Sequence, residues 1–135
     1  MLRSVEMKDF IQKDPVKVKA DDDVYEAIRL LSAYRVSGVC VVDDGGYLVG
    51  ILSELDCLKA ILSSVYNKSP VGKVGEFMTK EVITVKATDN IVDVASDMLK
   101  FKHRRRPVIS DDGLLIGQVT CRQILNAVKD FGGSD

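Results

Sequence analysis

Two stretches of the chain carry the same pattern of hydrophobic and polar positions. In each, a short extended run is followed by a segment with apolar residues at helical spacing. Two apolar strands then flank a turn rich in Gly, Asp and Ser, and a second helix follows. The sequence therefore predicts the order β-α-β-β-α twice. The predicted elements are the extended runs Val16–Val18 and Ile83–Val85, a helix with Val24, Ala27, Ile28 and Leu31 and one with Ile91, Val94, Ala95 and Met98, the turns Asp43–Gly46 and Ser110–Gly113, the strands Tyr47–Leu52 and Leu114–Val119, and helices that start at Ser53 and Thr120.

The two stretches align without a gap at an offset of 67 residues. Phe10–Ile61 lies opposite Phe77–Val128, and 13 of these 52 positions are identical. Unrelated segments of ordinary composition would share about three. Even the preceding turn matches, since Met7-x-x-Phe10 lies opposite Val74-x-x-Phe77. The chain is therefore an internal duplication.

The predicted repeats are residues 1–66, with an N-terminal lead-in helix, and residues 67–135, with the linker YNKSPVGKVG at Tyr66–Gly75. Each repeat has only a few short strands and is too small to bury enough apolar surface alone. We therefore expect both repeats to form one module, an α+β sandwich with a pseudo-two-fold axis. Two related clefts are expected at the junction.

Composition narrows the function classes. The 135 residues are 46% hydrophobic and 29% charged, as in a folded protein, and the net charge is −1. A general nucleic-acid binder would carry a basic excess over a whole face, so the composition argues against that class. The N-terminus lacks the apolar core of a signal peptide, and runs such as Val39–Val42 are too short to cross a membrane.

The chain lacks the residues for a catalytic or metal site. His103 is its only histidine, which excludes a metal site of several imidazoles. Cys40, Cys57 and Cys121 have no metal-ligand spacing, and nothing around Cys40 or Cys57 marks a nucleophile. We therefore expect no enzyme activity, no cofactor and no metal, and a location in the reducing cytoplasm.

Two motifs in this duplicated unit carry a family resemblance. They are GILSELD at Gly50–Asp56, of the form G-x-x-[ST]-x-x-D, and RRPVIS at Arg105–Ser110. With two units of about sixty residues in register, the chain resembles the tandem CBS-domain family, or Bateman module, from Met7 to Val128. The resemblance implies a sensor that binds AMP, ADP, ATP or a related adenosyl compound between the repeats. It also implies a disk-like homodimer.

The resemblance also implies roles for particular residues. The Ser or Thr of the motif contacts phosphate, the Asp holds the ribose hydroxyls, and residues near the first strand and before the Pro enclose the adenine. The expected nucleotide-binding residues are Val16, Lys17, Ser37, Gly38, Ser53, Asp56, Arg104 and Arg105.

The same motif has a second interpretation as a helix cap. A Ser or Thr followed three residues later by an acid or amide is a capping box, which satisfies backbone N–H groups without a ligand. Thr120 with Gln123 suits a capping box well, whereas Asp56 has a shorter reach back to Ser53. A carboxylate can instead accept from two ribose hydroxyls, which favours Asp56 over Gln123 as a ribose ligand.

The basic run KFKHRRRP at Lys100–Pro107 has no counterpart in the first repeat. Arg104 and Arg105 lie opposite Ser37 and Gly38. By the resemblance, these arginines reach the phosphate of a nucleotide whose ribose Asp56 holds, and guanidinium groups suit phosphate well. The alternatives are a solvated helix end that complements the helix dipole and a nucleic-acid contact, which would give a steep salt dependence.

The other cleft lacks both features. It has Thr120, Arg122 and Gln123 in place of the serine and carboxylate, and faces Ser37 and Gly38. We therefore predict one competent nucleotide site per chain and one degenerate cleft. The whole is interpreted as a non-catalytic regulatory module acting on an unknown effector protein. The alternative is a ligand-free interaction or dimerisation module.

Overall fold

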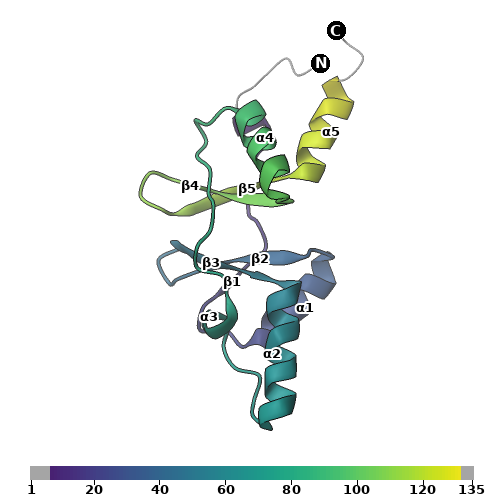
Figure 1. Cartoon of the computed structure of the whole chain (residues 1–135). Coiled ribbons are helices and arrows are strands. Elements are labelled where there is room, and N and C mark those ends of the chain that lie inside the picture. The colour runs from purple at the N-terminus through teal and green to yellow at the C-terminus, as the bar shows by residue number, and fades with distance from the viewer. Residues whose placement is uncertain (1–6, 132–135) are drawn as a thin grey trace. The chain divides into compact units, whose positions relative to one another are not determined.

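The computed structural model describes residues 7–131 of the chain (Figure 1). The element order follows the predicted repeat, and most boundaries agree within a few residues. The elements are η1 Met7–Asp9, β1 Lys17–Lys19, α1 Val24–Tyr34, β2 Gly38–Val42, β3 Leu48–Ser53, α2 Glu54–Asn67, α3 Val74–Phe77, α4 Ile91–Phe101, β4 Arg105–Ile109, β5 Leu115–Thr120 and α5 Cys121–Phe131.

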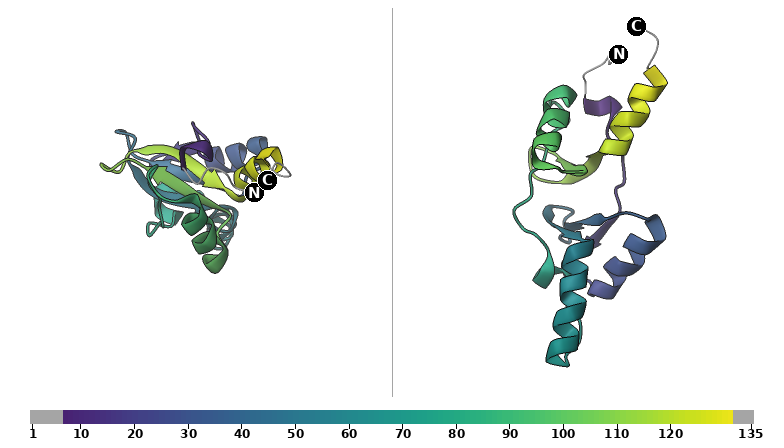
Figure 2. Two further views of the ribbon diagram at one scale, coloured as in Figure 1. Left: turned by 90° about the horizontal axis from the view of Figure 1, so that it is seen from above. Right: turned by 45° about the vertical axis from the view of Figure 1, so that its right-hand side comes forward.

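These elements form two compact units. The first-repeat unit is Pro15–Val82, and the second-repeat unit combines residues 7–14 with residues 83–131. In each unit the two long helices lie on one face of a small sheet (Figures 1 and 2). The predicted repeats, 1–66 and 67–135, follow the sequence duplication, whereas the compact units divide the chain after Asp14 and after Val82.

The first-repeat unit has a three-stranded sheet. β1 pairs parallel with β2, and β2 pairs antiparallel with β3. Every residue of β2 is buried, and β2 is the central strand, with a neighbour on both edges. α1 begins where the side chain of Asp23 accepts the Tyr25 N–H at 2.9 Å, and it ends at Arg35 in the left-handed conformation. Val24, Ala27 and Leu31 then face the core.

The second-repeat unit has a two-stranded sheet of β4 and β5. The predicted extended run Ile83–Val85 makes a single bridge, between Val85 and Val108. A difference in sequence explains the shorter pairing. In the first-repeat unit the Cys40 N–H donates to the Val16 carbonyl at 3.3 Å, and Pro107 occupies the position equivalent to Cys40. Because proline has no N–H, this bond cannot form.

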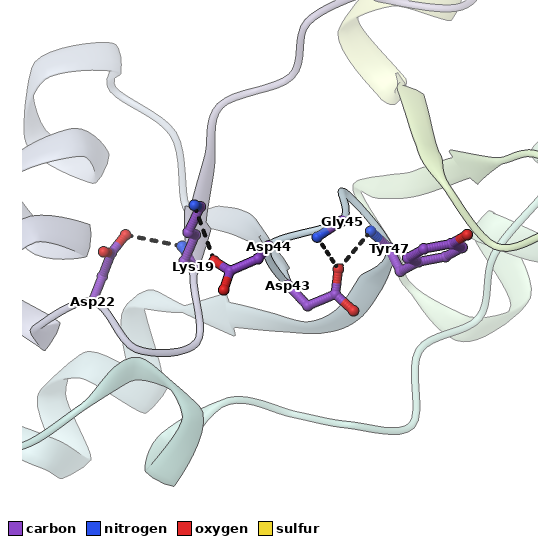
Figure 3. Close-up of polar contacts among 6 residues, drawn as sticks. All are labelled: Lys19, Asp22, Asp43, Asp44, Gly45 and Tyr47. Carbon is purple, nitrogen blue, oxygen red and sulfur yellow. Dashed lines mark hydrogen bonds and ion pairs between the residues drawn. The ribbon is translucent and has the colours of Figure 1, made fainter.

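The hairpin of the first-repeat unit is held at its turn and across to β1 (Figure 3). Asp43 Oδ1 accepts the N–H groups of Gly45 at 2.9 Å and Tyr47 at 3.0 Å. Lys19 Nζ contacts Asp44 Oδ1 at 3.1 Å, and this hydrogen bond raises the pKa of Lys19. Lys86 and Asp111 form the equivalent pair in the second-repeat unit. Both pairs are exposed, so each contributes little to the stability of the protein.

Each repeat begins with a short lead-in segment, residues 7–12 in the first repeat and residues 74–79 in the second. Met7 and Phe10 of the first lead-in segment are buried in the core of the second-repeat unit. Val74 and Phe77 of the second lead-in segment pack in the first-repeat unit. Each unit is therefore completed by the lead-in segment of the other repeat.

Paired backbone hydrogen bonds hold these segments in place. Gln12 and Gln118 exchange N–H···O=C bonds at 2.8 and 3.0 Å, and their side chains bond at 2.9 Å. Thr79 and Ile51 exchange the equivalent bonds at 2.8 and 2.9 Å. Each segment therefore adds a short antiparallel pairing to the edge of β3 or β5.

Glycine makes this close pairing possible at equivalent positions. A Cβ at Gly117 would overlap Ile11 Cγ2 and would lie 2.8 Å from the Gln12 carbonyl oxygen. A Cβ at Gly50 would lie 2.8 Å from both the Met78 sulfur and the Thr79 carbonyl oxygen. The glycine of the G-x-x-[ST]-x-x-D motif is therefore required for packing, because the backbone of the lead-in segment passes too close to it for a side chain.

Gly117→Ala is expected to destabilise the protein by about 2 kcal/mol, because a methyl group there forces the lead-in segment away from β5. Chemical denaturation of the variant measures this loss. Gly38→Ala is the matched control, since its Cβ would meet its nearest atom, the Leu52 carbonyl oxygen, at an ordinary 3.4 Å. Equal stability of the two variants would contradict the close packing at Gly117.

Candidate functional site

Ser53 and Asp56 form a reciprocal cap at the start of α2. Ser53 is the last residue of β3 and has an extended backbone, with φ −97° and ψ 168°. Its Oγ accepts the Asp56 N–H at 3.1 Å, and Asp56 Oδ2 accepts the Ser53 N–H at 2.9 Å. Both bonds are partly buried. Asp56 was expected to suit this cap less well because of its shorter reach, but the structure shows a complete capping box at Ser53 and Asp56.

The cap leaves part of the Asp56 carboxylate available. Within the described residues, the Asp56 side chain bonds the protein through Oδ2 alone. A carboxylate has two oxygens and about four acceptor positions, so Oδ1 can accept from a further donor. Capping and ligand binding are therefore compatible roles for Asp56.

The equivalent cap at α5 is only half formed. Thr120 Oγ1 accepts the Gln123 N–H at 3.1 Å. Among residues 7–131, the Gln123 side chain makes no return bond to the Thr120 N–H, so the pair that suits a capping box well by residue type forms only half of one. A neutral amide oxygen is a weaker acceptor than a carboxylate, and this favours the reciprocal bond at Asp56.

The six first-repeat residues predicted to bind nucleotide lie close together. Gly38 pairs with Ser53 in the sheet, and the Ser37 carbonyl accepts the Glu54 N–H at 3.0 Å. Val16 and Lys17 lie beside Cys40, two residues along β2 from Gly38. Together with Asp56, these residues surround the end of the sheet where β3 passes into α2. The free N–H groups at the N-terminus of α2 therefore lie among these residues.

The predicted basic residues lie at the equivalent place in the second-repeat unit. Arg105 pairs with Thr120 in the sheet, and the Arg104 carbonyl accepts the Cys121 N–H at 2.9 Å. The side chain of Arg104 is exposed, and that of Arg105 is partly buried. Arg122 lies in the first turn of α5 and adds to the positive charge beside this helix N-terminus. The pairing of Arg104 and Arg105 with Ser53 and Asp56 joins residues of different units and stays a prediction.

Arg106 has a structural role that the sequence interpretation missed. Its side chain is 3% exposed, and Nη1 contacts Asp97 Oδ2 at 2.6 Å. Nε donates to His103 Nδ1 at 3.2 Å, and the guanidinium lies 5.9 Å from the centre of the Phe101 ring. Nη2 is buried without a hydrogen-bond partner among the described residues. Strand alternation offers a signal, because Arg106 and the apolar Val108 are two residues apart in β4 and therefore face the same side of the sheet, where both are buried.

The environment of Cys57 does not activate it as a nucleophile. Cys40 and Cys57 are buried and Cys121 is exposed, and all three are free thiols. Burial raises the pKa of the Cys57 thiol, and the nearby charges of Asp56 and Glu54 raise it further. A raised pKa keeps the thiol protonated and unreactive. No group of three or more His, Cys, Asp or Glu side chains that could hold a metal ion occurs among the side chains that the structure describes.

None of the helices described is both long enough and apolar enough to span a membrane.

Comparisons with known proteins agree on one family. A model of the CBS domain matches residues 7–63 and 74–130. Inosine-5'-monophosphate dehydrogenase of Aquifex aeolicus is 36% identical over 124 residues, which cover 87% of this chain. The chain spans only 24% of that enzyme's length, so the similarity concerns one part of it.

Solved structures agree over nearly the whole chain. The crystal structure of CBSX2 in complex with AMP has 32% identity and a TM-score of 0.84, and the match covers 95% of this chain and 98% of that chain. CBSX2 is a CBS-pair protein from Arabidopsis thaliana. The CBS domain pair of protein MJ0100, in complex with 5'-methylthioadenosine and S-adenosyl-L-methionine, has 26% identity and a TM-score of 0.76, with 98% of both chains covered.

These matches confirm the α+β fold class and the resemblance drawn from the duplicated motifs. The two matched segments each contain one β-α-β-β-α repeat, apart from the first strand of the second, which is reduced to a bridge. The chain belongs to the CBS-domain family and consists of a tandem pair of CBS domains.

Proposed function

We propose that this chain is a non-catalytic regulatory module that binds an adenine nucleotide, AMP, ADP or ATP. The observation that carries the proposal is the start of α2, where a partly buried carboxylate caps the helix and keeps an oxygen for a ligand hydroxyl. The AMP complex of CBSX2, which is similar over nearly its whole length, supports an adenine nucleotide as the ligand. The methylthioadenosine complex of the MJ0100 domain pair makes other adenosyl compounds the first alternatives to test.

In this proposal, each part of the nucleotide has its own residues. Asp56 accepts hydrogen bonds from the ribose hydroxyls, and Ser53 with the N–H groups of α2 binds phosphate. Val16, Lys17, Ser37 and Gly38 enclose the adenine. Arg104 and Arg105 bind the phosphate from the second repeat.

We further propose one competent site per chain. A carboxylate is available at Asp56, whereas its equivalent is the uncharged Gln123. Because charged acceptors bind hydroxyl groups more strongly than amides do, the cleft with Thr120, Arg122 and Gln123 is expected to be degenerate. Isothermal titration calorimetry with AMP is expected to give a stoichiometry of about one per chain. Two equivalent sites per chain would contradict this asymmetry.

Two substitutions are expected to separate the roles at the phosphate and the ribose. Arg104→Ala should weaken AMP binding about tenfold and leave adenosine binding unchanged, because adenosine has no phosphate. Asp56→Asn should weaken both ligands about tenfold, while its amide oxygen can still cap the Ser53 N–H. Calorimetry with AMP and adenosine measures all four values.

Lys59→Ala is the matched control for the removal of a positive charge, because Lys59 is an exposed residue of α2 outside the proposed site. It should bind both ligands like the unmodified protein. Equal losses of AMP and adenosine affinity in Arg104→Ala and Asp56→Asn would contradict the assigned roles.

The second candidate function is a ligand-free interaction or dimerisation module, and exposed apolar side chains favour it. A groove of ≈ 400 Å³ on the first-repeat unit lies between α1 and α2 and is lined by residues that include Ile28, Cys57 and Ile61. Thermal-shift measurements with AMP, ADP, ATP and S-adenosyl-L-methionine separate the candidates, because a ligand of the folded state must raise the melting temperature. The large exposed apolar side chains of the helices are Tyr25, Tyr34, Leu55, Leu58, Leu62, Val65, Tyr66, Val92, Leu99, Phe101 and Leu125.

These helix faces also suit the predicted homodimer. Exposed apolar surface of this extent on paired helices is typical of an interface. In the regulatory proposal, the nucleotide prefers one arrangement of the subunits and so changes the affinity for an effector protein. The three free thiols support a reducing, cytoplasmic location.

A further inference from the structure

The first lead-in segment, residues 7–12, binds the second-repeat unit as a separate peptide would. Met7 and Phe10 are 0% and 1% exposed and lie in one core with Val85, Met98 and Val119. Side-chain burial and edge-strand pairing together are the means by which sheet domains bind extended peptides. The segment therefore has all the features of a bound ligand that is also covalently attached.

Three hydrogen bonds then fix the register of the segment. Two run between the backbones of Gln12 and Gln118, and the third joins their side chains. The side-chain bond is partly buried and has no counterpart at the other lead-in segment, where Thr79 pairs with Ile51. A glutamine pair of this kind makes the docking specific, because each amide would lose its partner in a shifted register.

The connection from this segment to the first-repeat unit is short and strained. It runs through Lys13 and Asp14 to Pro15, where the unit begins. Asp14 has φ 52°, in the left-handed region that non-glycine residues rarely adopt. The residue before a proline also prefers an extended backbone. A straightened hinge would relieve this strain, and short strained hinges are known to favour segment exchange.

We propose that the second-repeat unit accepts residues 7–12 from a second copy of this chain, so that two chains form a segment-exchanged dimer. Every contact of the segment is then made as in the single chain, and Asp14 is free to adopt an extended conformation. The exchange does not depend on a nucleotide. It also leaves the exposed faces of the long helices available, so it is distinct from a dimer formed through them.

A disulfide across the bridge reports directly which chain supplies the segment. Gln12 and Gln118 form a hydrogen-bonded antiparallel pair, whose Cα atoms lie about 5.5 Å apart, within the range of a disulfide. We would combine Gln12→Cys and Gln118→Cys with Cys121→Ser, which removes the exposed native thiol. After oxidation at high protein concentration, non-reducing gels and intact mass should show a covalent dimer. A dimer formed only through the helices gives disulfides within single chains.

Two substitutions at Asp14 test whether backbone strain at this hinge promotes the segment exchange. Asp14→Pro cannot adopt φ 52°, because proline fixes φ near −65°, and it should raise the covalent dimer fraction severalfold. Asp14→Gly removes the strain and should lower that fraction. The variant with Gln12→Cys as its only new cysteine, also with Cys121→Ser, is the control for non-specific crosslinking.

The proposal is wrong if the oxidised products are single chains for the Asp14 parent and both hinge variants at every protein concentration. Should Asp14→Pro fail to fold by circular dichroism, the parent and Asp14→Gly still decide the matter. Equal dimer fractions in these two would overturn the role of hinge strain, and a complete absence of dimer would overturn the exchange itself.

Discussion

Phe10→Ala is expected to lower the free energy of unfolding by about 3–5 kcal/mol, and to do so in the second-repeat unit. Phe10 is 1% exposed, and removal of its ring leaves a cavity beside Met7 and Val85. Hydrogen exchange followed by mass spectrometry locates the loss. Amides of α4 and α5 should exchange faster, whereas those of α1 and α2 should keep their protection.

Phe77→Ala is the matched control, because Phe77 is the residue equivalent to Phe10 in the duplication. Phe77 is only partly buried, so its loss should be smaller, and it should appear in α1 and α2 instead. Faster exchange in α1 and α2 of the Phe10 variant would contradict the packing of the lead-in segments. Sequence position alone predicts that opposite result.

Asp97→Ala is expected to destabilise the chain by about 3 kcal/mol. The substitution leaves the buried guanidinium of Arg106 without its carboxylate, and breaking a buried pair costs about 3–5 kcal/mol. The lower end of this range applies because the Asp97 side chain is 42% exposed. Equilibrium denaturation in urea measures the change.

Two further variants isolate the charge effect. Asp111→Ala breaks the exposed pair with Lys86 in the same unit and should cost at most about 1 kcal/mol. The double variant Asp97→Ala with Arg106→Met should recover much of the stability, because no uncompensated charge remains in the core. If Asp97→Ala costs no more than Asp111→Ala, the buried pair is not a stabilising one.

Local patterns in the sequence predicted most of the elements. The helical spacing of Val24, Ala27 and Leu31 places these residues on the buried face of α1. The turns at Asp43–Gly46 and Ser110–Gly113 contain Gly46 and Gly113, both of which have positive φ. These features depend on neighbours a few residues apart, so the sequence carries them directly.

Features that join distant residues were not predictable in this way. The motifs Met7-x-x-Phe10 and Val74-x-x-Phe77 are nearly alike, and nothing in either indicates which unit it completes. The sequence also presents Arg104 and Arg106 as one basic run. The structure separates them, because Arg106 is buried and its guanidinium contacts Asp97 of α4, nine residues earlier.

The motif spacing placed Ser53 and Asp56 at the start of a helix, where the structure has them, but it did not give the bonds between them. Their membership of a nucleotide site stays a prediction. By residue type, Gln123 suits a reciprocal cap better than Asp56, yet it is Asp56 that forms one. That outcome depends on backbone angles at Ser53 and on acceptor strength, which residue spacing does not express.

The pairing of Gln12 with Gln118 has a consequence for synthesis on the ribosome. The two residues are 106 positions apart, so Met7 and Phe10 leave the ribosome well before β5, which completes their site, has been made. At about 5–20 residues per second, this apolar segment waits roughly 5–20 seconds for its partner strand. The segment is therefore translated before the rest of its unit but can dock only after it.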